Sequence, residues 1–265
     1  MAQSAYLYND LVKSLAGASI AITNEDPVFP TENLQSEQIA LVCRTSAKVA
    51  IKLQFTLAAP AALKAFYIGN HNFSAGASFD INSYTAADWT TGKVTVETKV
   101  PRALDVYHYE SSAPASRTYW EFDFTNATSA DTYFSIGRVM LYTDWVTLTS
   151  IEDYERGRSY GFRNIINETD YGIRWIHRMT DKRERFGLAW RARKQATSAL
   201  PAELRTLYNA VYGDAYPFLF VPDITLTDCH YVYIEDNELR WTDVFGSDTV
   251  FNINLNLIEA VRGKL

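Results

Sequence analysis

Only two of the 265 residues are cysteines, and they stand far apart, at positions 43 and 229. A disulfide framework or a cysteine metal cluster needs more cysteines at closer spacing, so the sequence excludes both. No apolar run approaches the roughly 18 residues of a membrane helix. The first ten residues contain no basic region leading into an apolar one. We therefore expect neither a secretory signal nor a membrane partner.

Motifs that carry catalysis or nucleotide binding are also missing. The chain contains no His-Glu-x-x-His, Gly-x-Ser-x-Gly, Walker or dinucleotide-binding pattern. Its histidines, at positions 71, 108, 177 and 230, have no metal-ligand spacing within one predicted element. The carboxylate pairs Glu121/Asp123 and Asp236/Glu238 lie on strand or turn faces that we expect to be exposed. The sequence thus predicts no enzymatic activity, no cofactor and no bound metal.

Aromatic residues, by contrast, are abundant. The chain has 17 tyrosines and 14 phenylalanines, which favour strands over helices. Its length predicts two domains. The net charge of −6 disfavours nucleic-acid binding, and we expect no specific nucleic-acid partner.

The first half of the chain is dominated by short alternating segments. In residues 49–57 every second residue, beginning with Val49, is apolar, which predicts an amphipathic strand. Further strand-like segments lie at residues 65–68, 78–81, 93–97, 119–124 and 133–142. Many short strands with polar turns predict an antiparallel β-sandwich. We place this domain at residues 20–145, after an N-terminal arm or short helix at 1–19.

The order of motifs in this half resembles a known domain. Phe-Pro-Thr-Glu-Asn-Leu at residues 29–34 is followed by Cys-Arg-Thr-Ser at 43–46. A Gly-Asn-His-Asn turn at 69–72 and Ile-Gly-Arg at 136–138 are the more specific parts. Together they resemble the discoidin-like jelly-roll domain of structural proteins of tailed bacteriophages. Related domains bind sugars or cell surfaces, so the resemblance also admits a binding role.

Two features of this half are candidate ligand contacts. Asn70, His71 and Asn72 form a polar loop, and Trp89 is an aromatic residue suited to stacking on a sugar ring. The structural alternative is that the loop side chains bond to the turn backbone and hold a tight corner. For Trp89, the alternative is packing beneath a loop. The sequence leaves both alternatives open.

The second half predicts a β-sandwich or split-barrel domain with one helix over residues 146–265. Segments 173–179 and 185–193 predict a pair of strands joined by a hairpin. Residues 201–213 predict the helix, because a proline begins it, an apolar stripe follows and a glycine ends it. Residues 250–259 alternate apolar and asparagine side chains, which predicts a half-buried strand.

Charge is strongly segregated within this half. Residues 156–194 hold eleven basic and four acidic residues, so their net charge is 11 − 4 = +7. Residues 222–259 hold one basic and eight acidic residues, so their net charge is 1 − 8 = −7. Contact between copies would pair the two segments head to tail and close a ring. Pairing within one sheet is the alternative. The candidate interface residues are Arg174, Arg178, Arg185, Arg191, Arg193, Asp223, Glu235, Asp243 and Glu259.

A second ordered set of motifs lies in this half. It consists of the basic hairpin, the helix, the Tyr-Pro-Phe-Leu-Phe-Val-Pro run at 216–222 and the last strand. This set resembles the ring-forming domain of phage distal-tail proteins, although in many of those proteins the ring domain comes first and the sandwich second.

The two resemblances imply a structural component of a phage tail tip or baseplate, located in the virion tail after assembly in the host cytoplasm. The expected partners are further copies in a ring of six or three, other tail proteins and a host surface glycan. The alternative is a carbohydrate-binding host-adhesion protein that acts through the jelly roll. A glycoside hydrolase that uses one of the carboxylate pairs is a third alternative.

Overall fold

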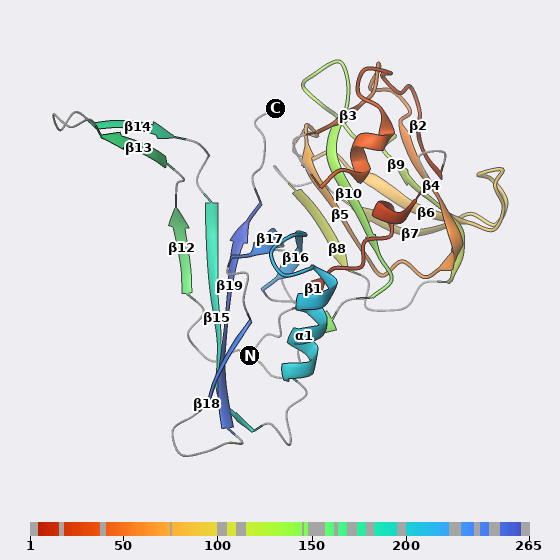
Figure 1. Cartoon of the computed structure of the whole chain (residues 1–265). Helices are drawn as coiled ribbons and strands as arrows, with labels where there is room; N and C mark the ends of the chain where they lie inside the picture. Colours follow the sequence, from red (N-terminus) through yellow and green to blue (C-terminus); the bar gives the residue numbers. More distant parts are fainter. Residues whose placement is uncertain are drawn as a thin grey trace. The chain divides into compact units, whose positions relative to one another are not determined.

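The structure is a computed structural model (Figure 1). It describes residues 5–15, 19–37, 41–74, 76–99, 105–109, 115–144, 146–147, 157–161, 164–168, 174–178, 183–194, 200–222, 229–235, 239–243 and 250–260. The chain divides into two compact units. Unit 1 comprises Met1–Tyr8 and Val146–Arg262, and unit 2 comprises Asn9–Trp145 and Gly263–Leu265. No helix in the described part has the length and apolar composition that crossing a membrane requires.

Unit 2 contains two antiparallel sheets that enclose a shared core. One has five strands in the order β2 (Ile20–Ile22), β4 (Lys52–Ala61), β9 (Arg117–Asp123), β6 (Phe79–Tyr84) and β7 (Val94–Lys99). The other has four strands in the order β3 (Cys43–Arg44), β10 (Ser135–Tyr142), β5 (Ala65–His71) and β8 (Asp105–Tyr109). Phe66 of β5 and Phe122 of β9 join the two inner faces, with ring centroids 5.2 Å apart. The predicted antiparallel β-sandwich is confirmed.

The amphipathic strand predicted at residues 49–57 is β4, with one correction at its start. Leu53 and Phe55 are fully buried in the core, in agreement with the alternation. Val49, however, is 73% exposed, because β4 begins only at Lys52. Ile51 is still buried and its carbonyl accepts from the Phe124 N–H, but Ala50 has a positive φ of 52°, so the extended alternation stops between Val49 and Ile51.

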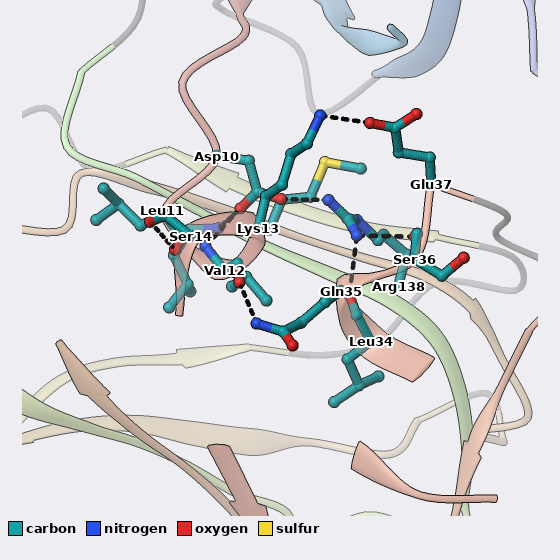
Figure 2. Close-up of polar contacts among 12 residues, drawn as sticks. Asp10, Leu11, Val12, Lys13, Ser14, Leu34, Gln35, Ser36, Glu37 and Arg138 are labelled. Atoms are coloured by element: carbon teal, nitrogen blue, oxygen red, sulfur yellow. Dashed lines mark hydrogen bonds and ion pairs between the residues drawn. The ribbon is translucent and has the colours of Figure 1, made fainter. Parts of the chain in front are cut away.

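A buried ion pair fixes the chain against the outer side of β10 (Figure 2). One Arg138 nitrogen donates to Asp10 Oδ2 at 2.5 Å, and another donates to the carbonyls of Leu34 and Ser36 at 3.1 and 2.8 Å. The side chains of Arg138 and Asp10 are only 2% and 8% exposed. Asp10 Oδ1 also accepts from the Leu141 N–H, at 3.2 Å. The 3-10 helices η1 (Val12–Ser14) and η3 (Thr31–Gln35) are thereby tied to β10.

A tight corner forms at the end of β5. Asn70 has a positive φ of 54°, and the Asn72 side chain accepts from the Ser135 N–H at 2.8 Å and donates to the Tyr133 carbonyl at 3.1 Å. His71 is only 6% exposed, and its Nδ1 accepts from the Phe73 N–H at 3.2 Å. The neutral ring therefore carries its proton on Nε2. Burial lowers the pKa of His71 to about 4.

Unit 1 is built on an eight-stranded antiparallel sheet (Figure 1). Its order is β11 (Val146–Thr147), β1 (Ala5–Leu7), β16 (Phe218–Val221), β17 (His230–Ile234), β19 (Val250–Glu259), β15 (Arg183–Lys194) and β12 (Gly157–Gly161), and β18 (Arg240–Asp243) also pairs with β19. A separate two-stranded sheet pairs β13 (Asn164–Glu168) with β14 (Arg174–Arg178). The arm expected at residues 1–19 is thus divided, since β1 belongs to this sheet and η1 to unit 2.

Helix α1 (Leu200–Ala210) supplies the other side of the unit 1 core. Its buried Leu204 and Leu207 pack with Trp190 of β15 and Leu255 of β19. Gly213 has a φ of +73° and its N–H bonds to the Tyr208 carbonyl, as expected for a residue that ends a helix. The predicted helix and the predicted last strand are both confirmed.

The predicted pairing of the two basic segments is wrong. β14 pairs with β13, whereas β15 pairs with β12 on one side and with β19 on the other. The physical reason is burial, because the alternating apolar face of β15 matches that of β19, which is far away in sequence. Leu188 lies opposite Leu255, and Trp190 lies opposite Ile253.

Replacing Arg138 with methionine should lower the free energy of unfolding by about 3–5 kcal/mol, because it leaves the Asp10 carboxylate buried without its partner. Asp10→Asn keeps the acceptor for the Val12 and Leu141 N–H groups. The double variant should therefore be destabilised by less than the sum of the single variants. Urea denaturation of the four proteins measures this coupling. Lys13→Met, which breaks the exposed Lys13–Glu37 pair, is the control and should cost about 0–1 kcal/mol. Additive effects would contradict the assigned pairing.

His71 should make stability depend on pH. The unfolded chain binds a proton at His71 below about pH 6.5, whereas the folded chain does so only near pH 4. Stability is therefore highest above pH 6.5 and falls as the pH falls toward 4, by about 3 kcal/mol from this group. His71→Asn retains an acceptor for the Phe73 N–H without this titration. Urea denaturation from pH 7 to 4 should give a shallower loss for the variant, and equal slopes would refute the role of His71.

Candidate functional site

The outer face of the five-stranded sheet is polar, although its inner face is apolar. Strand register places Gln54, Glu121 and Asn82 in one row across β4, β9 and β6. The next row along the strands contains Thr56, Tyr119 and Tyr84. Because side chains alternate between the two faces of a sheet, both rows point away from the core that contains Phe55 and Phe122.

Glu121 is the centre of this face. Its Oε1 accepts from Tyr84 Oη at 2.6 Å, from Lys52 Nζ at 3.2 Å and from Asn82 Nδ2 at 3.4 Å. Its Oε2 accepts from Gln54 Nε2 at 2.8 Å. We call Lys52, Gln54, Asn82, Tyr84 and Glu121 the Glu121 network.

The sequence predicted that Glu121 is exposed, and this prediction is wrong. The residue faces outward, but it is 0% exposed because the neighbouring side chains of the network cover it. Its partner in the suggested carboxylate pair, Asp123, instead binds Lys52 Nζ at 3.5 Å. Glu121 is saturated by protein donors, and this arrangement suits an anchor for its neighbours better than an acid or base.

Electrostatics fix the protonation of two members. Burial lowers the pKa of Lys52, but its hydrogen bond to Glu121 and the charges of Glu121 and Asp123 outweigh this and raise the pKa overall. Burial also raises the pKa of the Tyr84 hydroxyl, and the adjacent Glu121 raises it further. At neutral pH, Lys52 is therefore a cation and Tyr84 is a neutral donor.

Trp89 lies beside this network. Its ring makes edge contacts with Tyr84 and Tyr119, each with centroids 5.7 Å apart. Trp89 has a positive φ of 55°, which non-glycine residues rarely adopt. Asp88 holds the loop by accepting from the Thr90 and Thr91 N–H groups at 2.9 and 2.8 Å. The half-buried Trp89 is thus fixed on the outer face by a stiff turn.

The result is a rigid surface that combines aromatic rings with fixed polar groups. Lys52, Gln54, Thr56 and Tyr119 are each half-exposed and lie within three successive rows of the same face of the sheet. Such a surface can place hydrogen-bonding groups around a polar ligand while an aromatic ring contacts its apolar side.

In the loop of Asn70, His71 and Asn72, the side chains make the contacts expected if they hold a tight corner. The His71 and Asn72 side chains bond to nearby backbone groups, and Asn72 Nδ2 also donates to Asp131 Oδ2 at 2.7 Å. Ligand binding by this loop stays a prediction.

The predicted interface residues are spread over unit 1. Arg185 and Glu235 form an ion pair of 2.9 Å within the same chain, which is the local pairing that the sequence left open. Strand register also places Arg193 and Asp243 on either side of Phe251. Their contact between copies stays a prediction.

The remaining interface candidates fall in different places. Arg191 belongs to β15, and Arg174 and Arg178 belong to the two-stranded sheet. Asp223 lies outside the described residues.

The structure gathers one group that the sequence analysis missed. Glu259, an interface candidate, lies beside His230 and Glu184 on three neighbouring strands. Each residue lies on the same face of its strand as the buried apolar residues, and the alternation in the sequence shows this. The sequence does not show that the three residues lie close together, because their proximity depends on the order of strands in the sheet.

No protein-family model and no curated protein matches the sequence. Solved structures with partial likeness include the family 32 carbohydrate-binding module of NanJ from Clostridium perfringens in complex with galactose. It is 11% identical, with a TM-score of 0.39, over 52% of this chain and 98% of that one. The lectin domain of lectinolysin, complexed with Lewis B antigen, is 12% identical, with a TM-score of 0.39, over 52% and 99% of the two chains. XRCC1 bound to the catalytic domain of DNA polymerase β is 12% identical, with a TM-score of 0.39, over 47% and 93%.

Proposed function

We propose that unit 2 binds carbohydrate on the outer face of its five-stranded sheet. The observation that carries the proposal is the position of Trp89 and Tyr119 next to the Glu121 network. A sugar ring has an apolar face of C–H groups and a rim of hydroxyls. Recognising it requires an aromatic surface next to hydrogen-bonding groups that are already held in place.

The Glu121 network supports the proposal through its rigidity. Lys52 and Gln54 are each bound to the buried carboxylate on one side and are half-exposed on the other. Their remaining polar atoms are therefore oriented before a ligand arrives, and little conformational entropy is lost on binding. The cation of Lys52 also favours a glycan that carries hydroxyl or carboxylate groups.

Trp89→Asn should lower glycan affinity at least tenfold, which corresponds to about 1.4 kcal/mol. Asparagine tolerates the positive φ at this position, so the turn should remain while the indole is lost. A glycan array with the full-length chain identifies the ligand, and isothermal titration calorimetry measures its affinity for both proteins.

The matched control is Tyr212→Asn. Tyr212 in unit 1 is also an aromatic residue with a positive φ, 52°, and it is 72% exposed. This variant should bind the glycan as the native chain does. A native chain that binds no glycan on the array, or full affinity in Trp89→Asn, would exclude this face as a carbohydrate site.

As a second function we propose assembly of the chain into a ring within a phage tail tip. The supporting observation is the unequal length of neighbouring strands in unit 1. β12 pairs with β15 only as far as Gly187, whereas β15 continues to Lys194. Among the described strands, only β19 pairs with this last part of β15, so its other edge suits strand addition by another copy. Arg191 and Arg193 lie on this part.

Arg191→Glu/Arg193→Glu should convert a ring into smaller species, because it reverses the charge of the proposed contact. Size-exclusion chromatography with mass measurement at low salt shows the change. Raising the salt above about 0.15 M should weaken the native assembly if exposed charge pairs hold it.

Lys93→Glu/Arg205→Glu reverses the same amount of charge at two exposed positions outside β15 and serves as the control. It should assemble as the native chain does. A native chain that is monomeric at all concentrations would rule out the ring, while leaving carbohydrate binding by unit 2 untouched.

A further inference from the structure

Three titratable side chains lie on the apolar face of the unit 1 sheet, at one end of its core. Glu184 continues the row of Phe186 and Leu188 on β15. Glu259 likewise follows Leu257 on β19, and His230 precedes Val232 on β17. The three strands are direct neighbours in the order β17, β19, β15. Period-two alternation therefore points all three side chains to the same side.

Their ligand atoms converge. His230 Nδ1 lies 3.0 Å from Glu259 Oε1 and 3.9 Å from Glu184 Oε2. One ligand atom from each residue falls within 4.8 Å of the others. The side chains of His230, Glu184 and Glu259 are only 7%, 9% and 17% exposed.

The two carboxylates of this cluster lie on neighbouring strands. The register of β15 with β19 places Glu184 next to Glu259, and the Glu184 N–H donates to Glu259 Oε2 at 3.2 Å. Like charges on adjacent strands repel, and shielding from water strengthens the repulsion. A divalent cation held by the imidazole and both carboxylates would offset this repulsion.

We propose that Glu184, His230 and Glu259 bind a divalent transition-metal ion of the zinc class. Zinc accepts imidazole nitrogen and carboxylate oxygen at about 2.0–2.2 Å in tetrahedral geometry, which separates ligand atoms by about 3.4 Å. The distances from His230 Nδ1 to the oxygens of Glu259 and Glu184, 3.0 and 3.9 Å, lie on either side of this value. The imidazole ligand favours zinc over calcium or magnesium, which prefer oxygen ligands alone.

This site would join three strands whose residues are distant in sequence. The ring centroids of Phe186 and His230 lie 4.6 Å apart, so Phe186 shields one side of the cluster. The three protein ligands leave a fourth position for water or another donor. Bound metal would therefore stabilise the end of the sheet, and this role is independent of carbohydrate binding in unit 2.

The test uses the full chain, stripped with a chelator and dialysed against zinc-free buffer at neutral pH. We expect one zinc ion per chain by elemental analysis, a Tm that rises with zinc concentration, and reversal by fresh chelator. Calcium and magnesium at equal concentration should leave Tm unchanged. Cobalt, as a spectroscopic substitute, should give the visible absorption of tetrahedral coordination. These measurements need no variant, so they remain decisive even if a substitution prevents folding.

His230→Gln should abolish zinc binding, and Glu259→Gln should weaken it at least tenfold. His71→Asn, at a buried histidine of unit 2, is the control and should bind zinc as the native chain does. Native protein that binds no zinc and shows no change in Tm would overturn the proposal. Full zinc binding by His230→Gln would also overturn it.

Discussion

Arg138 is a buried cation in unit 2, and the segments packed around β10 supply its hydrogen-bond acceptors. Its nitrogens donate to the Asp10 carboxylate and to two carbonyls at the end of η3. These partners come from segments more than 100 residues earlier in the chain. Since an unpaired buried charge costs several kcal/mol, η1 and η3 have to stay on this face. The strand is consequently buried on both sides.

The other buried carboxylates of the sheets also need partners, and they differ in which partners they have. Glu121 is covered by four donors from its own sheet, and it fixes side chains whose outer ends reach the surface. Glu184 and Glu259 share one histidine and face the apolar side of unit 1. A saturated carboxylate at the base of an exposed face organises a surface. Two carboxylates around one imidazole instead bring oxygen and nitrogen ligand atoms together, which is the arrangement that a transition-metal ion binds.

The sequence revealed which residues share a face but not which strands are neighbours. The period of two identified β19 over its full length, because it is regular there and buried on one side. The same reasoning failed for the partner of β15, since hairpin proximity suggested β14 and the matching apolar face belonged to β19. Glu121 was judged exposed for a related reason. Alternation shows that it points outward, while its burial depends on side chains of β4 and β6 that only the fold brings together.

Strand order also explains the opposite charges of the two segments of unit 1. β15 of the basic segment 156–194 pairs with β19 of the acidic segment 222–259. Arg185 and Glu235 of these two segments form an ion pair within one chain. Charge balance alone therefore does not require assembly, and the proposed ring relies instead on the edge of β15 beyond Gly187. The two proposed functions use different units and can reinforce each other. A ring would present several copies of the unit 2 face together, so a weak affinity for each glycan would be enough for firm attachment.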